Sequence, residues 1–374
     1  MEKKQWKDIL HIVSGKNQSA VVNPNGKYPI YGSGGLMGYA DDYLCETGTT
    51  IVGRKGTINR PIFVNEPFWN IDTAFGIVPN EGLCHKYLYY FCVHFNFMPL
   101  DKSTGRPSLA KSDLLKIEMP VPSLSEQQRI VSRIEELFSS LDNAVETLQK
   151  TKEQLTVYRQ AVLKELLSND TWKKYTLGEI VTTEEGDRGK KYPKRSDYRS
   201  EGYCLFLSAQ NVRPYGWNFE DSTFLTKEKH EELHGGTVQK GDVVITTRGT
   251  LGNVAVLDDS VPYEVLRINS CMLILRCNKD IVSPYYLSKF IMSPMFRQLI
   301  QKQKSGTAQP QIPANQLREL TIRVPSLEEQ QAVIRKIESR LSVCDSIEQT
   351  VNTALAQAEA MRQSILKEAF EGRL

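Results

Sequence analysis

The sequence predicts an α+β protein in which two β-rich globular parts alternate with two long helices that pair as a coiled coil. An internal repeat is the first observation: Val121-Pro-Ser-Leu-Ser-Glu-Gln-Gln128 returns 203 residues later as Val324-Pro-Ser-Leu-Glu-Glu-Gln-Gln331. Each copy opens a long stretch without Gly or Pro, as a long helix requires. Runs of β-branched and aromatic residues bounded by turn formers precede each copy. Two similar halves suggest a ligand or partner that is itself two-fold or bipartite.

Length and composition indicate a globular protein of two or three domains. The chain has 374 residues, of which 40% are apolar, an ordinary fraction for this class. Met1 to Trp6 lead into no apolar signal-peptide core, and no apolar run reaches the roughly 20 residues that span a bilayer. The seven cysteines form no CxxC pair, which fits reduced thiols. We therefore expect a cytoplasmic protein without membrane contact.

The first globular part is expected to contain a hairpin followed by a helix. Thr49–Gly53 and Ile62–Asn65 are β-branched runs around a turn, so they predict two paired strands. Tyr87–Phe91 predicts a helix, which leads to the turn at Lys102–Arg106. The second part repeats this order with strands at Asp242–Thr247 and Val254–Leu257.

The second part also carries two features of its own. Ser283-Pro284 supplies a helix N-cap and a first-turn Pro, and we expect that helix to run toward Lys302. Residues 187–199 hold six basic and two acidic residues with two interleaved tyrosines. This loop is either a solvated charged loop or one that follows a phosphate backbone. The offset between the parts grows from 166 residues (Trp6 to Trp172) to 203, so the second part contains extra loops.

The two long helices begin at equivalent capping boxes, since Ser123 precedes Glu126 and Ser326 precedes Glu329 by three residues. Each helix is expected to run for about 65 Å at 1.5 Å per residue. Apolar residues keep a seven-residue step in both, which indicates a coiled coil whose simplest pairing is between the two copies. The predicted seams are Ile134, Leu141, Leu148, Leu155 and Val162, and Ile337, Cys344, Val351, Ala358 and Ile365. The charged residues elsewhere form either a solvated face or a docking surface for other subunits.

Both globular parts offer a hairpin turn with a cation beside Gly-Thr and a second turn around Lys-Ser. Arg54-Lys55-Gly56-Thr57 corresponds to Arg248-Gly249-Thr250, and Lys102-Ser103 to Lys304-Ser305. Glycine lets a partner approach the backbone, and Lys or Arg beside exposed N–H groups suits phosphate oxygens. Arg, Gln and Asn can also read base edges. A single turn of this kind is usually only a hairpin, but repetition in both halves favours nucleic-acid binding.

Motifs for catalysis and metal binding are not supported. Asn65-Glu66-Pro67-Phe68 lacks the first Pro of the Asn/Asp-Pro-Pro-aromatic motif of adenine methyltransferases, and Gly32–Gly35 lacks the Lys-Ser/Thr of a nucleotide-binding loop. His230 and His234 share a predicted helix face with no third ligand nearby, and Cys84, His85, Cys92 and His94 lie on an aromatic helix. We expect no catalytic residue and no metal in this chain.

Taken together, the two globular parts, the two Pro-Ser-Leu-x-Glu-Gln-Gln segments and the two long helices resemble the specificity subunit of type I DNA restriction-modification systems. The resemblance covers the whole chain and is strongest at Pro120–Ile130 and Ser364–Leu374. Tyr31–Gly35, Gly53–Thr57 and Gly306–Pro310 look like turns of that family's target-recognition domains. Two departures occur: Ile58-Asn59-Arg60 lacks the Gly that commonly follows Gly-Thr-Ile, and Arg106 stands where the second copy has Gln309.

The resemblance implies two target-recognition domains on an antiparallel, pseudo-two-fold coiled coil. It implies that each domain reads one half of a bipartite double-stranded DNA target, that the helices set the gap, and that two methyltransferase (M) subunits and motor-nuclease (R) subunits join. S-adenosylmethionine would belong to the M subunits, and ATP and Mg to the R subunits. The expected domains are residues 1–122 and 169–325 for recognition and 123–168 and 326–374 for the helices.

Two sets of site residues follow from the repeated turns, the basic loop and the resemblance. The expected DNA-binding residues are Tyr31, Ser33, Arg54, Lys55, Thr57, Asn59, Arg60, Lys102, Ser103, Arg106, Lys190, Lys191, Lys194, Arg195, Asn211, Arg213, Arg248, Thr250, Lys302, Lys304, Ser305, Thr307 and Gln309. The expected partner-binding residues are Arg159, Gln160, Lys164, Glu165, Arg362, Gln363, Lys367 and Glu368. The alternatives are the specificity subunit of a type IIB-like system and a bivalent scaffold that binds proteins only.

Overall fold

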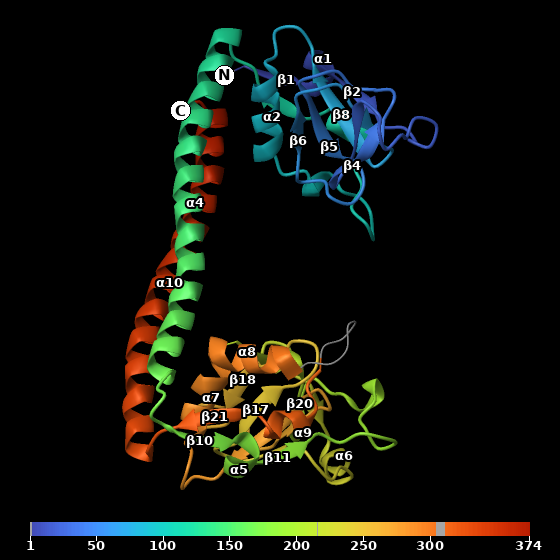
Figure 1. The fold of residues 1–374 in the computed structure, drawn as a ribbon. Coiled ribbons are helices and arrows are strands. Elements are labelled where there is room, and N and C mark those ends of the chain that lie inside the picture. The colour runs from blue at the N-terminus through green and yellow to red at the C-terminus, as the bar shows by residue number, and fades with distance from the viewer. Residues whose placement is uncertain (1, 215, 304–310) are drawn as a thin grey trace. The chain divides into compact units, whose positions relative to one another are not determined.

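A computed structural model describes residues 2–214, 216–303 and 311–374 of the chain (Figure 1). The chain divides into two compact units. The first contains Met1–Lys150 and Val351–Leu374, and the second contains Thr151–Thr350. Each unit therefore combines one β-rich globular part with portions of both long helices.

The first unit contains three small sheets. A four-stranded antiparallel sheet has the order β2-β8-β5-β6, and a three-stranded sheet has the order β4-β3-β7, in which β3 and β7 run parallel. A third, two-stranded sheet pairs β1 with β9. The strands are β1 (Lys3–Gln5), β2 (Leu10–Ser14), β3 (Tyr28–Gly32), β4 (Gly35–Ala40), β5 (Thr49–Gly53), β6 (Ile62–Val64), β7 (Trp69–Asn70), β8 (Ala74–Pro79) and β9 (Glu118–Pro120). The helices before the long one are α1 (Trp6–Ile9), α2 (His85–His94), η1 (Met98–Leu100) and α3 (Lys111–Leu114).

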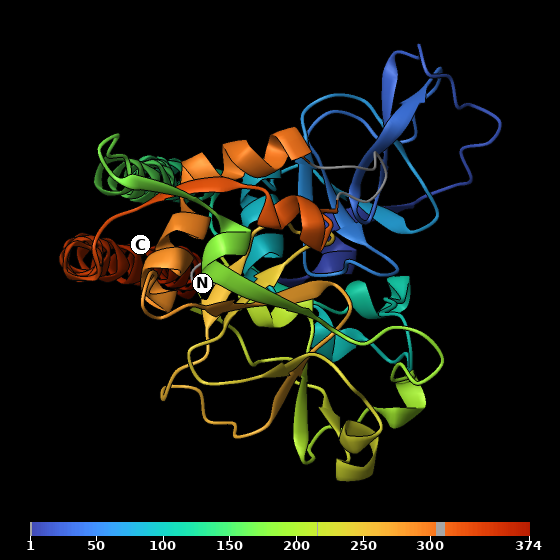
Figure 2. The same ribbon diagram turned by 60° about the horizontal axis from the view of Figure 1, so that its bottom comes forward.

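The second unit repeats this plan with insertions. Its four-stranded sheet β11-β20-β17-β18 corresponds to the first sheet, and β12 and β19 form the parallel pair. Figure 2 turns this unit toward the viewer. Its strands are β10 (Lys173–Thr176), β11 (Val181–Glu185), β12 (Cys204–Leu207), β13 (Val212–Arg213), β14 (Gly216–Trp217), β15 (Phe224–Leu225), β16 (Thr237–Val238), β17 (Val243–Thr246), β18 (Val254–Val256), β19 (Leu266–Ile268), β20 (Met272–Cys277) and β21 (Thr321–Val324). Its shorter helices are α5 (Leu177–Ile180), η2 (Arg195–Asp197), η3 (Ala209–Asn211), α6 (Lys227–Glu231), α7 (Pro284–Met292), α8 (Pro294–Gln303) and α9 (Ala314–Arg318).

The predicted hairpins are confirmed, whereas one predicted helix is wrong in extent. β5 pairs with β6, and β17 pairs with β18, both antiparallel. The helix that starts at Pro284 does not run to Lys302, because it ends at Met292 and Pro294 starts a new helix, α8. A proline in the middle of a helix would remove a backbone hydrogen bond and clash with the preceding turn. The Ser293 hydroxyl bridges the break, since it donates to the Phe290 carbonyl at 2.6 Å and accepts from the Phe296 amide at 3.3 Å.

The long helices are α4 (Leu124–Leu167) and α10 (Leu327–Glu371), of 44 and 45 residues. At 1.5 Å per residue each is about 66 Å long. The capping box at Ser326 is complete, because Ser326 and Glu329 bond each other's backbone amides. At Ser123 only the hydroxyl half forms (3.4 Å), since the Glu126 carboxylate pairs with Arg129 instead.

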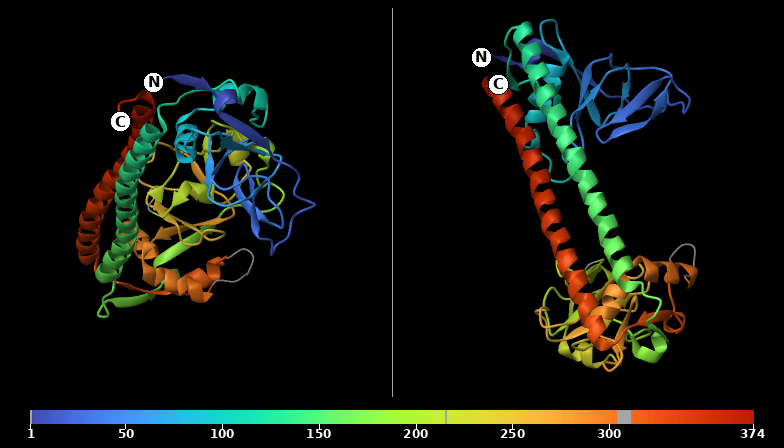
Figure 3. Two further views of the ribbon diagram at one scale, coloured as in Figure 1. Left: turned by 90° about the horizontal axis from the view of Figure 1, so that it is seen from above. Right: turned by 60° about the vertical axis from the view of Figure 1, so that its left-hand side comes forward.

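The two helices run side by side and antiparallel in each unit (Figure 3). In the first unit Arg129 donates to the Leu374 carbonyl and Arg362 pairs with Asp142. In the second unit Arg159 pairs with Asp345, and Glu165 pairs with Arg340. Residue numbers therefore fall along α10 as they rise along α4. The predicted seams are the contact faces, because every seam residue is buried except Leu141 and Leu148, which are half-buried.

Each globular core continues into the helices of its own unit. In the first unit Trp6, Tyr87 and Phe91 share a cluster with Ile134 of α4 and Phe370 of α10. In the second unit Tyr286 and Leu287 of α7 share a cluster with Leu163 of α4 and Ile337 of α10. Apolar burial of this kind is the main term that stabilises a folded domain. Each globular part is consequently fixed to helix segments by a common core.

In the described residues, no helix is both long and apolar enough to cross a membrane.

Candidate nucleic-acid interface

The structure brings together the two predicted basic turns of the first unit. The turn after β5 meets the loop 101–108 in a short β-bridge between Lys55 and Ser108. Gly56 donates its amide to the Pro107 carbonyl at 2.8 Å, and Leu109 donates to the Arg54 carbonyl at 2.8 Å. Two segments that lie about 50 residues apart in the sequence thus form one surface.

Local chemistry holds these turns in shape. Asp101 accepts hydrogen bonds from the backbone amides of Ser108 and Ser103 and from the Ser103 hydroxyl. Because these bonds favour the carboxylate, they lower the pKa of Asp101 below its ordinary value. Gly56 has φ +86°, and a Cβ there would lie 2.7 Å from the Arg106 guanidinium. Glycine is favoured at this position because L side chains rarely adopt that positive φ.

The exposed cations of this surface are available to an anionic ligand. Lys55, Arg60 and Arg106 are exposed, and no carboxylate in the described part of the chain forms an ion pair with them. Thr57 and Ser103 are also exposed. Lys102 is exposed but pairs with Asp113 at 2.7 Å. Arg54 is half-buried, with its guanidinium 5.6 Å from the centre of the Phe75 ring.

Three predicted contact residues of the first unit have internal partners. Ser33 is 6% exposed, and its hydroxyl donates to the Lys55 carbonyl at 2.8 Å, so it positions the turn and is not itself accessible to DNA. The Asn59 side chain donates to Asn96 at 2.8 Å and accepts from the Phe97 amide at 2.7 Å. Tyr31 is half-buried, edge-on to Phe68.

The second unit has the equivalent arrangement. Arg248 forms a β-bridge with Gln311, and Ile312 donates to the Thr247 carbonyl at 3.0 Å. Thr250 is exposed and Arg248 is half-buried. Lys302 lies in α8. Lys304, Ser305, Thr307 and Gln309 fall outside the described residues.

Two cavities flank this turn of the second unit and identify residues that the sequence did not suggest. One, of about 200 Å³, is lined by Arg188, Arg248 and Gln311 among others. The other, of about 420 Å³, lies between Thr250 and helix α8 and is lined by Arg297 and Gln301. Arg297 and Gln301 are four positions apart on α8 and therefore share a helix face. In the sequence, this four-residue spacing is the feature that could have pointed to Arg297 and Gln301 as neighbours on one surface.

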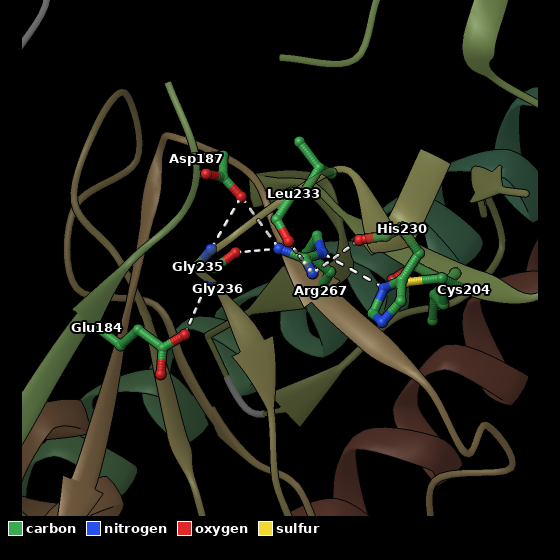
Figure 4. Close-up of polar contacts among 9 residues, drawn as sticks. Glu184, Asp187, Cys204, His230, Leu233, Gly235, Gly236 and Arg267 are labelled. Atoms are coloured by element: carbon green, nitrogen blue, oxygen red, sulfur yellow. Dashed lines mark hydrogen bonds and ion pairs between the residues drawn. The ribbon is translucent and has the colours of Figure 1, made fainter. Parts of the chain in front are cut away.

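The basic loop 187–199 is anchored by a buried arginine (Figure 4). Arg267 of β19 is 3% exposed, pairs with Asp187 at 3.1 Å and also donates to the carbonyls of His230, Leu233 and Gly235. Asp187 in turn accepts from the Gly235 amide at 3.0 Å. Because the start of the loop is fixed in this way, the loop leaves the sheet at a defined place.

The two tyrosines of the loop point inward while its cations remain outside. Tyr192 and Tyr198 each lie 6.0 Å from Phe206, ring centre to ring centre, and join the small core around Cys204. The predicted cations of the loop, Lys190, Lys191, Lys194 and Arg195, are all exposed. Arg213 is exposed as well, but Asn211 is 2% exposed and its side chain bonds the backbone of Ser208, Asn218 and Asp221. The Asn211 side chain thus bonds backbone groups that precede β13 and follow β14, and its contact with DNA stays a prediction.

A family model described as the type I restriction modification DNA specificity domain matches residues 1–157 and 169–357. The chain belongs to this family. The specificity subunit of EcoBI from Escherichia coli is 23% identical over 87% of this chain and 73% of the relative. A putative type I specificity subunit of Haemophilus influenzae is 22% identical over 95% and 92% of the two chains.

Solved structures share the fold. A chain from a structure of type I restriction-modification complex assembly and conformational transition has a TM-score of 0.76 at 16% identity and covers 100% of this chain and 98% of its own. The HsdS subunit of Thermoanaerobacter tengcongensis has a TM-score of 0.52 at 16% identity, with 100% and 97% covered. These structures show the fold, and the family match makes the chain a type I restriction-modification specificity subunit.

In this specificity subunit, the predicted partner-binding residues fall into two groups. Arg159 is 4% exposed and donates to Asp345 at 2.6 Å and to Glu348 at 2.8 Å, so it joins α4 to α10 and is not a surface residue. Arg362 is half-buried, pairs with Asp142 and lies over the Phe138 ring at 5.0 Å. Gln160 is half-buried. The exposed members of the set are Lys164, Glu165, Gln363, Lys367 and Glu368.

Proposed function

We propose that each globular domain of this specificity subunit reads one half of a bipartite double-stranded DNA target. The observation that carries the proposal is the repeated surface, in which Lys55 bridges Ser108 in one unit and Arg248 bridges Gln311 in the other. Cationic turns with accessible backbone suit phosphate oxygens, and Arg and Gln suit base edges. The extra strands β13, β14 and β16 of the second unit support readout of a different sequence by each half.

The proposed domains are residues 1–122 and 169–325 for recognition, with 123–168 and 326–374 as the helices that fix the gap between half-sites. Half-sites on one face of DNA lie about 34–36 Å apart per helical turn, and helices of about 66 Å are long enough for such a spacing. The proposal predicts that exchange of residues 169–325 for a foreign recognition domain alters one half of the target only. A change in both halves would contradict independent recognition.

We propose further that the helices bind two M subunits, one at each end of the pair, and that R subunits then join. Support comes from exposed residues that repeat at the 203-residue offset: Lys164-Glu165 with Lys367-Glu368, and Tyr158 (48% exposed) with Met361 (52% exposed). A docking surface present twice favours two copies of one partner. In this proposal S-adenosylmethionine binds the M subunits, which methylate adenine, and ATP and Mg bind the R subunits, which cleave.

The test is native purification of the full chain with the proteins expressed beside it, followed by mapping of methylated adenines in that genome. The expected result is a complex with an adenine methyltransferase and a split target that disappears when the gene for this chain is deleted. A pure chain that binds proteins but shows no salt-dependent DNA binding, alone or in complex, would instead identify a protein scaffold.

A further inference from the structure

The β3–β4 hairpin of the first unit exposes an unusual amount of apolar surface. In β4, Leu36 is 55% exposed, Met37 is 62% exposed and Tyr39 is 42% exposed. Val22, which bridges Ala40 at the edge of the same strand, is 54% exposed. Single exposed apolar residues are common, but several on one short element mark a contact surface.

The end of the hairpin is narrow and has room around it. Gly32 and Gly35 are paired across the turn Ser33-Gly34, and Gly35 has φ +120°. Cβ atoms built at Gly34, Gly35 and Gly38 would meet nothing within 4 Å, whereas one at Gly32 would lie 2.8 Å from the Met37 sulfur. The Met37 thioether therefore lies against the Gly32 backbone.

The hairpin is continuous with the cationic surface of the first unit. The buried Ser33 hydroxyl donates to the Lys55 carbonyl at 2.8 Å, and Ser33 donates its amide to the Thr73 hydroxyl at 3.5 Å. Arg54 and Lys55 donate their backbone amides to the Thr73 carbonyl at 2.8 and 3.1 Å. Thr73 thus holds the turn at Ser33 next to the turn at Arg54 and Lys55. A ligand that contacts Lys55 would therefore also lie at the end of the hairpin.

We propose that the hairpin is an apolar wedge that inserts Leu36 and Met37 at a base step of double-stranded DNA. This inference rests on the proposed DNA-binding function and deepens it. Proteins that bend DNA insert Leu, Met or similar side chains between base pairs and partly unstack them. Phosphates on either side of that step would meet Lys55 and Arg60. The faces of the neighbouring bases would bury Leu36 and Met37, which are exposed in the free protein. Ser33 and Thr73 are positioning residues that align the wedge with the cations.

The experiment uses the full chain in complex with its methyltransferase partners and a duplex that carries the mapped target. 2-Aminopurine replaces one base at a time through the first half-site and the gap, but never the methylated adenine. The native complex should raise the fluorescence at one or two adjacent positions, because unstacking relieves quenching. The double variant Leu36→Ala/Met37→Ala should lose that rise and bind at least about tenfold more weakly, since two large apolar side chains are no longer buried.

The salt slope of binding should stay at the native value in the double variant, because no cation is removed. Met98→Ala is the matched control, since Met98 is a 47% exposed methionine of η1 in the same unit, and it should behave as the native chain. Native fluorescence and affinity in the double variant would overturn the wedge. Loss of the methyltransferase on purification of that variant would also overturn the wedge, because the hairpin would then be a binding site for the methyltransferase. If the native complex itself bound no DNA, the proposed function would fail, and the two failures are therefore distinguishable.

Discussion

The side-chain oxygen of Gln127 accepts a 2.8 Å hydrogen bond from the backbone amide of Cys84, the residue that precedes helix α2. The Gln127 amide donates to the carbonyls of Gly82 and Pro122. In the second unit Gln330 makes the same three bonds, to Ser283, Ile281 and Pro325. Both glutamines are fully buried. The repeated Glu-Gln-Gln motif thus acts as a joint that fixes a long helix to the N-terminus of the helix in its globular domain.

Gln127→Ala should lower the free energy of unfolding of the first unit by about 2 kcal/mol, because it leaves buried polar backbone groups without partners. Gln330→Ala should do the same in the second unit. Thermal or denaturant unfolding of the full chain measures the effect. Gln128→Ala and Gln331→Ala are the matched controls, since these neighbours are exposed. Equal stability of the buried-site and control variants would show that Gln127 and Gln330 do not stabilise the attachment of the long helices to the globular domains.

Arg159→Met should destabilise the helix pairing of the second unit by about 2 kcal/mol, because two charge-assisted hydrogen bonds are lost while the apolar stem is kept. Burial by itself would lower the pKa of Arg159, but the bonds to Asp345 and the charge of Glu348 more than compensate, so the net shift is upward and the guanidinium stays charged. Unfolding monitored by helix content is the measurement. Arg335→Met, at an exposed position of α10, should change little, and a matching loss there would argue against a specific role of Arg159.

The sequence predicted the periodic and local features well. The seams of α4 and α10, the two hairpins and the two basic turns all follow from spacing and turn chemistry within a few residues. The roles of Ser33, Asn211 and Arg159 could not be predicted, because a polar residue type does not show whether tertiary contacts bury it. The same holds for Gln127 and Gln128, which are adjacent and chemically identical but face opposite environments.

Asp187→Asn should loosen the basic loop of the second unit, because it leaves the buried Arg267 without its carboxylate. Removal of one partner from a buried ion pair typically costs about 3 kcal/mol or more. The expected readout is faster tryptic cleavage after Lys190 and Lys191 in the folded chain, since loop opening exposes the backbone. Asp221→Asn makes the same change at an exposed position of the unit and should leave the cleavage rate unaltered. Native cleavage rates in Asp187→Asn would show that the loop does not depend on this anchor.

His230 should make the second unit less stable in mild acid. Burial, and next the charge of Arg267, lower the pKa of His230, because both disfavour the imidazolium. The unfolded chain then binds the proton more readily. The stabilisation from neutral His230 is therefore complete above a pH of about 6.5 and is lost as the pH falls from there through the lower pKa of the folded state. His230→Asn should reduce the drop in melting temperature between neutral and mildly acidic pH, with His234→Asn as the control. An undiminished drop would assign the acid sensitivity to other groups.

Lys55→Ala and Arg248→Ala should each weaken DNA binding by the complex and reduce its salt dependence. A cation that neutralises one phosphate contributes about 0.9 to the slope of log K against log salt concentration, so the double variant should lose about 2. Titration of fluorescent duplex DNA at several salt concentrations measures the slope. Lys86→Ala is the control, because Lys86 is exposed on α2 but pairs with Glu135 at 2.6 Å. Since Lys55 and Arg248 occupy equivalent turns, equal losses would indicate that both domains engage the DNA in the same way. A loss in one variant alone would indicate that only one turn follows the phosphate backbone, and unchanged slopes in both would exclude the turns as phosphate contacts.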